Sequence, residues 1–260
     1  MSAPDPKLKM RIKPHGEHGK NLADQRLWIY GIHAVRAALL NPKRHKHRLV
    51  LTANAARRLA EDIGQAGIKA EIADLREFPA TLAPDTVHQG AALQTEPLQQ
   101  PDLGFMCKNV TATSRIVILD RVGDPRNVGA ILRSALAFEA EAVIGLARHS
   151  PPETGALAKS ASGAMELMPY IRVNNLARAI DGLRSENFML IGLDASSPED
   201  LASLPTIIHA GRVAIVLGSE HIGLRELTRK KCDFLVRICA GSLNVSNAAA
   251  VALFALRGIE

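Results

Sequence analysis

One segment of the chain reads DRVGDPRNVGAILRS, from Asp120 to Ser134. It follows the apolar run Ile116 to Leu119 and opens a segment with helical periodicity. A strand that ends in a polar turn with Gly and Pro, and then leads into a helix, is where α/β folds place ligands and catalytic groups. Asn127 and Arg133 lie near the start of this predicted helix, where a neutral amide and a fixed guanidinium can meet a nucleic-acid backbone.

Two later turns share this context. Leu217-Gly218-Ser219-Glu220 and Ser242-Leu243-Asn244-Val245-Ser246 each lie just beyond an apolar run. Because the carboxyl ends of parallel strands lie along one edge of a sheet, the three turns can share a crevice. Gly218 and Gly241 would let a flat or adenosine-like ligand approach the backbone closely. The candidates for hydrogen bonding to it are Asn127, Arg133, Glu220, Ser242, Asn244 and Ser246.

Each turn also has an ordinary structural interpretation. Asn127 can cap a helix, and Glu220 can lie in a first helical turn, where its charge suits the helix dipole. Asn244 and Ser246 can begin another helix. This interpretation is favoured for any one turn alone, whereas three such turns after three predicted strands favour a shared site.

From Arg115 onward, short apolar runs typical of buried parallel strands alternate with helical segments. The runs are Ile116–Leu119, Ala142–Leu146, Tyr170–Val173, Met189–Leu193, Val213–Leu217 and Phe234–Ile238. We therefore expect an α/β domain over residues 115–260, with a mostly parallel sheet flanked by helices on both faces. The chain contains neither GxGxxG after a strand nor GxxxxGK[ST], which disfavours a dinucleotide Rossmann site and a P-loop.

A smaller α/β unit is expected over residues 27–96. Its predicted strands are Leu27–Tyr30, Leu49–Thr52, Ile68–Ile72 and Gly90–Gln94, and its predicted helices are His33–Leu40, Ala55–Gln65 and Leu75–Leu82. Residues 97–114 contain Pro97 and Pro101 and little periodicity, which predicts a linker. His33 and His88 each lie near a Gly, and a turn or packing role is favoured over catalysis for both.

Positive charge is concentrated at the front of the chain. Residues 1–58 hold thirteen Lys and Arg against three Asp and Glu, whereas the formal net charge of the whole chain is +6. This asymmetry predicts an anionic partner bound through the N-terminal part, with residues 1–26 forming a basic, disordered arm. The candidate RNA-contacting residues are Lys43, Arg44, Lys46, Arg48, Arg57 and Arg58. The alternative is that these basic residues form an ordinary solvated face of the protein.

The cysteines and the apolar runs exclude other classes. Cys107, Cys232 and Cys239 are odd in number and lack CxxC spacing, so we expect no disulfide framework, no metal site and a reducing cytoplasm. No apolar run approaches the roughly 20 residues that span a bilayer, so we expect no membrane association.

Three segments resemble the motifs of the SpoU (TrmH-like) RNA ribose 2′-O-methyltransferases of the SPOUT superfamily. They are Asp124 to Arg133, Ile215 to Glu220 and Ser242 to Ser246, in the family's order and strand context. In the N-terminal unit, Tyr30 to Val35 and Val87 to Gly90 are similar to the subgroup that methylates guanosine in 23S rRNA.

The resemblance implies a fold and a set of roles. It implies a C-terminal domain with a trefoil knot that forms a pocket for S-adenosylmethionine, a separate RNA-binding N-terminal domain, and a homodimer. Asn127 and Glu220 would position the nucleotide and Arg133, which would bind the target phosphate and orient the ribose 2′-hydroxyl. Ser242 and Asn244 would complete the catalytic edge. The cofactor would contact Leu217, Gly218, Ile238, Gly241 and Leu243.

Two alternatives stay open. The segment Ile238 to Ser242 is shorter than the family's pattern and lacks its Pro, which favours a non-catalytic RNA-binding or ribosome-assembly protein that keeps the fold. The other alternative keeps the chemistry and changes the substrate to tRNA, although tRNA-acting relatives commonly lack the appended N-terminal domain.

Overall fold

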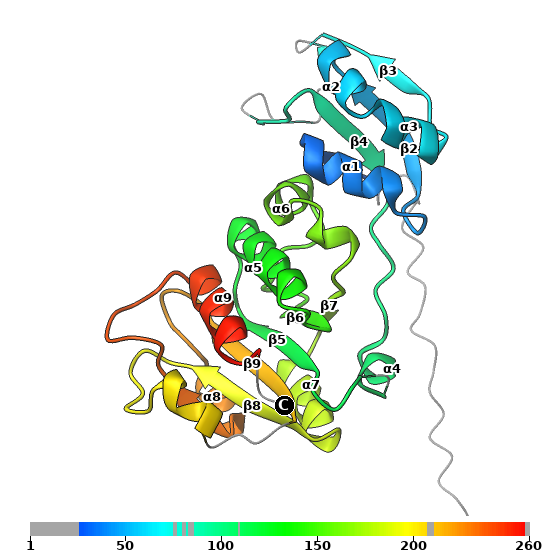
Figure 1. Ribbon diagram of the computed structural model, residues 1–260. Coiled ribbons are helices and arrows are strands. Elements are labelled where there is room, and N and C mark those ends of the chain that lie inside the picture. Colours follow the sequence, from blue (N-terminus) through cyan, green and yellow to red (C-terminus); the bar gives the residue numbers. More distant parts are fainter. Residues whose placement is uncertain are drawn as a thin grey trace, which may run out of the picture.

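The computed structural model describes residues 26–257 except 75–76, 80–81, 83–85, 109 and 207–210 (Figure 1). Apart from Arg26, the expected basic arm lies outside the described residues, as does much of the expected helix Leu75–Leu82. The described chain forms a small α/β unit followed by a larger one (Figure 1).

The small unit is a four-stranded sheet in the order β1-β4-β2-β3, with α1, α2 and α3. The strands β1 and β2 both run antiparallel to β4, and β3 runs parallel to β2. The bounds are β1 (Leu27–Tyr30), α1 (Ile32–Leu40), β2 (Lys46–Leu51), α2 (Ala53–Arg58), α3 (Ala60–Ala66), β3 (Ala70–Ile72) and β4 (Ala91–Thr95). The predicted strands are therefore confirmed, with β2 beginning at Lys46, three residues before the expected Leu49.

Two expectations, one for the N-terminal unit and one for the linker, need correction. The single helix expected over Ala55–Gln65 is divided at Leu59, which is fully buried and serves as C-cap of α2 and N-cap of α3. The expected linker contains a helix, α4 (Leu103–Lys108), because Cys107 packs into the core of the larger unit. A six-residue helix is too short to give a clear periodic signal.

The larger unit is built on a six-stranded sheet in which neighbouring strands pair in parallel, in the order β10-β8-β9-β5-β6-β7. The strands are β5 (Arg115–Asp120), β6 (Ala142–Leu146), β7 (Tyr170–Val173), β8 (Phe188–Leu193), β9 (Arg212–Gly218) and β10 (Phe234–Val236). All six predicted strands are confirmed.

Alternate residues of each strand enter two cores. Val117 and Leu119 face the core under α5, α6 and α9, whereas Ile116 and Ile118 face the core under α4 and α7. The helices are α5 (Pro125–Ala137), α6 (Gly155–Ala161), α7 (Leu176–Ser185), α8 (Glu226–Lys231) and α9 (Val245–Ala255), with short 3₁₀ helices η3 (Ala164–Glu166) and η4 (Leu201–Thr206). The expected helices on both faces of the sheet are confirmed.

The two units share a packed interface. The buried core under α5 and α6 continues into the N-terminal unit through residues such as Ile29 and Val35. At the contact between α6 and β1, a Cβ added to Gly155 would lie 2.3 Å from the carbonyl oxygen of Trp28. Because side chains cannot fit there, Gly155 allows the backbones of the two units to approach closely.

Arg44 links the units through a buried ion cluster. Its side chain is 0% exposed, and its Nη2 donates to Glu166 Oε1 at 2.6 Å. Its Nη1 pairs with Glu153 and donates to the carbonyl oxygen of Glu96 at 2.6 Å. Burial alone would lower the pKa of Arg44, but the two carboxylates raise it. The expectation that Arg44 contacts RNA is therefore wrong, because its guanidinium is enclosed by carboxylates of the larger unit.

Replacing Arg44 by Ala leaves two poorly exposed carboxylates without their cation, so Arg44→Ala is expected to lower the free energy of unfolding by about 3 kcal/mol or more. Arg48→Ala is the matched control, because Arg48 pairs with Glu71 in a half-exposed bridge and should stay close to the unsubstituted protein. Urea unfolding measures both. Equal effects of the two substitutions would contradict the role given to Arg44.

Candidate functional site

The pairing of β5 with β9 brings the first two polar turns together. Asp120, the last residue of β5, pairs with Gly218, the last residue of β9. The chain then enters α5, whose N-cap Asp124 accepts a hydrogen bond from the backbone N–H of Arg126 at 2.8 Å, with Pro125 at the first helical position. Cap and proline together fix where α5 begins.

Three side chains, one from each of the three turns, form a closed triangle of hydrogen bonds. They are Asn127, Glu220 and Asn244. Asn127 Nδ2 donates to Glu220 Oε1 at 3.0 Å. Asn244 Nδ2 donates to Asn127 Oδ1 at 3.1 Å and to Glu220 Oε1 at 2.5 Å. These hydrogen bonds therefore bring the three turns together, as expected for a shared site.

Helix capping explains one corner of this triangle and not the others. Asn244 is the N-cap of α9, and its Oδ1 accepts from the backbone N–H of Ser246 at 2.9 Å. The cap for α5 is Asp124 rather than Asn127, and Glu220 lies in a turn rather than in a helix. The cap fixes the orientation of the Asn244 amide, which leaves its N–H groups directed at the other two residues.

A buried carboxylate holds the base of the site. Asp120 is 0% exposed, and its Oδ1 accepts from Arg225 Nε at 2.6 Å while its Oδ2 accepts from the Arg225 backbone N–H at 3.0 Å. This two-fold contact ties the segment after β9 to the end of β5. Arg225 was not predicted from the sequence. The available signal was Asp120, because a carboxylate at the end of a buried strand needs a cation to pair with it.

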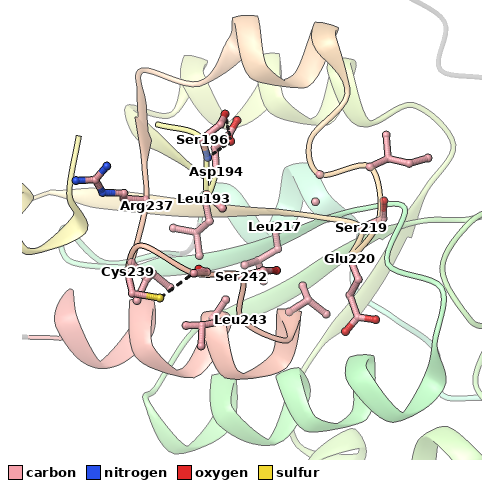
Figure 2. A pocket seen from close by; sticks show the side chains of 18 of the residues that line it. Leu193, Asp194, Ser196, Leu217, Ser219, Glu220, Arg237, Cys239, Ser242 and Leu243 are labelled. Atoms are coloured by element: carbon pink, nitrogen blue, oxygen red, sulfur yellow. Dashed lines mark hydrogen bonds between the residues drawn. The ribbon is translucent and has the colours of Figure 1, made fainter. Parts of the chain in front are cut away.

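A pocket of about 320 Å³ lies beside the triangle, at the carboxyl ends of β8, β9 and β10 (Figure 2). This volume is within the range of about 300–1,000 Å³ that is usual for small-molecule sites. All five residues expected to contact a cofactor line it, together with Glu220 and Ser242; the five are Leu217, Gly218, Ile238, Gly241 and Leu243.

The loop after β8 contributes a wall that the sequence analysis missed. Asp194 lines the pocket and accepts from Ser196 Oγ at 2.6 Å (Figure 2). It also pairs with Arg229. Burial would raise the pKa of Asp194, but the Ser196 hydrogen bonds and the Arg229 charge lower it overall. Its position directly after the apolar run of β8 was the signal in the sequence.

The remaining predicted residues are placed as follows. Arg133 is exposed on α5 and, among the described residues, its side chain contacts neither the triangle nor any ion-pair partner. Lys43, Arg57 and Arg58 are exposed. Lys46 Nζ donates to the Asn41 carbonyl oxygen at 2.9 Å. The three cysteines are free, and the described residues contain no group of His, Cys, Asp and Glu suited to a metal ion.

Comparison with known proteins gives the family. Residues 114–254 match the model described as the SpoU rRNA Methylase family, and residues 28–101 match that of RNA 2′-O ribose methyltransferase substrate binding. The chain belongs to the SpoU rRNA methylase family. The described residues of this SpoU protein form no helix that is long and apolar enough to cross a membrane.

Similar SpoU proteins cover most of the chain. The 23S rRNA (guanosine-2′-O-)-methyltransferase RlmB of Coxiella burnetii is 37% identical over 87% of this chain and 93% of its own. The RlmB protein of Escherichia coli K12 is 35% identical over 87% of this chain and 96% of its own.

Solved structures share the fold. The SpoU methyltransferase AviRb from Streptomyces viridochromogenes in complex with AdoMet has a TM-score of 0.71 at 21% identity and covers 93% of both chains. An AdoMet-bound rRNA methyltransferase from Sinorhizobium meliloti has a TM-score of 0.72 at 21% identity, over 90% of this chain and 88% of its own.

Gly218 offers a test of how tightly the pocket floor is built. A Cβ at Gly218 would lie 2.1 Å from the backbone carbon of Gly223, across a turn closed by the Gly223 N–H donating to the Ser219 carbonyl at 2.8 Å. Gly218→Ala is expected to lower the free energy of unfolding by about 1–3 kcal/mol, because backbone must move.

The matched control is Gly241→Ala, because Gly241 lines the same pocket and a Cβ there would meet nothing within 4 Å. That variant should unfold within about 0.5 kcal/mol of the unsubstituted protein. Chemical denaturation of both variants decides the point. If the two variants had similar free energies of unfolding, the backbone from Ser219 to Gly223 could move at little cost in free energy.

Proposed function

We propose that this protein transfers a methyl group from S-adenosylmethionine to the ribose 2′-hydroxyl of a guanosine in 23S rRNA. The observation that carries the proposal is the Asn127–Glu220–Asn244 triangle, whose Glu220 also lines a pocket of about 320 Å³. The RlmB relatives, at 35–37% identity over most of their length, support the rRNA guanosine as substrate.

The pocket residues suit S-adenosylmethionine. Leu217, Val236, Ile238 and Leu243 provide apolar surface for an adenine ring, and Gly218 lets the backbone of Gly223 pack closely beside the pocket. When bound, the cofactor supplies a methyl group that is already activated for transfer. The protein then has to hold the ribose hydroxyl in line and favour loss of its proton.

The triangle positions the groups that act on the target nucleotide. The Glu220 carboxylate accepts two amide N–H groups, which fix its orientation, and among the described residues it forms no ion pair. A carboxylate held this way can orient the guanidinium of Arg133 or a hydroxyl of the target nucleotide. Because an arginine stays protonated in proteins, Arg133 binds the target phosphate and polarises the 2′-hydroxyl rather than removing its proton. Ser242, at the pocket edge, completes the polar rim.

Three further properties belong to this proposal. The segment from β10 to α9 passes through the β8–β9 connection as a trefoil knot, which is supported by the bridge between Asp200 and Arg237 and by contacts of α9 with both α5 and η4. The protein acts as a homodimer, for which Val251 and Phe254 provide exposed apolar surface on α9. Methylation of rRNA places it in the cytoplasm.

The experiment that tests the proposal is incubation with unmodified 23S rRNA and methyl-labelled S-adenosylmethionine, followed by mapping of the 2′-O-methylated nucleotide. We expect one labelled guanosine. Arg133→Ala should reduce methyl transfer by about 10²-fold or more, because the phosphate loses its anchor, while calorimetry should show unchanged cofactor affinity.

Two results would contradict the proposal. Absence of cofactor binding at millimolar concentration would favour the non-catalytic RNA-binding protein that the short Ile238–Ser242 segment leaves open. Labelling of tRNA in place of rRNA would reassign the substrate.

A further inference from the structure

The carboxyl edge of the large sheet carries arginines to which the family motifs assign no role. Leu119 of β5 pairs with Gly145 of β6, so the chain leaves both strands at the same level shortly before Arg121 and Arg148. The two following loops are in contact, since a Cβ on Gly123 would lie 3.5 Å from the His149 carbonyl oxygen. Arg126 follows at the start of α5. We call Arg121, Arg126 and Arg148 the arginine edge.

Within the described residues, these three charges lack a close neutralising partner. Arg121 and Arg148 are exposed, and within the described chain neither side chain has an ion-pair or hydrogen-bond partner. The Arg126 side chain is 88% exposed and comes only within 3.9 Å of Asp124, a contact that contributes little in water. Three like charges on adjoining loops repel one another unless an anion lies between them.

The nearby carboxylates are already engaged. Asp120 is buried against Arg225, and Glu220 accepts the two amides of the triangle. Asp124 accepts the backbone N–H of Arg126 as the helix cap. The edge therefore keeps its positive potential.

Three arginines of the N-terminal unit are, by contrast, paired with carboxylates. Arg36 pairs with Asp62, Arg48 pairs with Glu71, and Arg44 is enclosed by Glu153 and Glu166. Arg44 and Arg48, two of the six cations that the sequence assigns to RNA contact, are thus compensated by carboxylates, whereas the arginine edge lies beside the candidate active site.

The arginine edge is also close enough to the site to act on the same substrate strand. Strand β5 lies between β9, whose turn carries Glu220, and β6, whose loop carries Arg148. Neighbouring strands are about 4.8 Å apart, so the two loops are separated by about 10 Å. Arg126 directly precedes Asn127 on α5.

We propose that Arg121, Arg126 and Arg148 bind the RNA phosphates that flank the target nucleotide, a role that rests on the proposed function. These contacts would hold the strand across the ends of β5 and β6 while the target ribose enters the triangle.

The test is filter binding of an unmodified 23S rRNA transcript over a series of KCl concentrations. The variant is Arg121→Asn with Arg148→Asn; Arg121 has a φ of 63°, a left-handed conformation that Asn tolerates. Affinity should fall on the order of tenfold, and the slope of log affinity against log salt should decrease by about 1–2. Replacing both arginines by Lys should restore the slope.

The control variant is Lys108→Gln with Lys230→Gln, which removes the same charge before β5 and β10, at the opposite edge. It should bind RNA as the unsubstituted protein does, and calorimetry with S-adenosylmethionine should give the same affinity for all variants. If the asparagine variant matches this control in affinity and slope, the arginine edge does not bind RNA. If the unsubstituted protein binds the transcript but does not methylate it, the proposed function fails and the binding comparison still decides the role of the edge.

Discussion

The parallel pairing of β5 with β9 is the constraint on which the site depends. Its register ends with Asp120 beside Gly218, so the helix start that carries Asn127 and the turn that carries Glu220 leave the sheet together. Asp120 then binds Arg225 and prevents the second turn from moving away. The N-cap of α9 adds Asn244 as the third corner. A shift of this register by one residue would turn each side chain to the other face of the sheet and separate the three motifs.

Much of this arrangement was accessible from the sequence, because buried parallel strands are short continuous apolar runs. All six strands of the large sheet were predicted, and the β1 and β7 ranges agree residue by residue. The rule about sheet edges pointed to Gly218 and Gly241 as places where a ligand could approach the backbone, whereas Leu217, Ile238 and Leu243 were expected in the pocket from the resemblance alone. The resemblance to SpoU motifs then supplied chemistry that periodicity alone does not contain.

What the sequence could not supply are contacts between distant segments. Arg44 looked like one member of a surface cluster, and only the docking of two units reveals that Glu153 and Glu166 enclose it. The break at Leu59 depends on burial of one side chain, a tertiary effect that local periodicity does not encode. The same limit applies to the arginine edge, because whether a cation is neutralised depends on carboxylates far away in the chain.

The central claim is that the three motifs act as one unit through their hydrogen bonds, and a double-mutant cycle on methyl transfer tests it most directly. The variants are Asn127→Ala, Asn244→Ala and the double variant, each assayed for kcat/KM on unmodified 23S rRNA. Because each amide holds the same Glu220 carboxylate and the other amide, we predict that the double variant is little slower than the slower single variant. If the two losses multiply instead, the residues act independently and the triangle is not the unit of function.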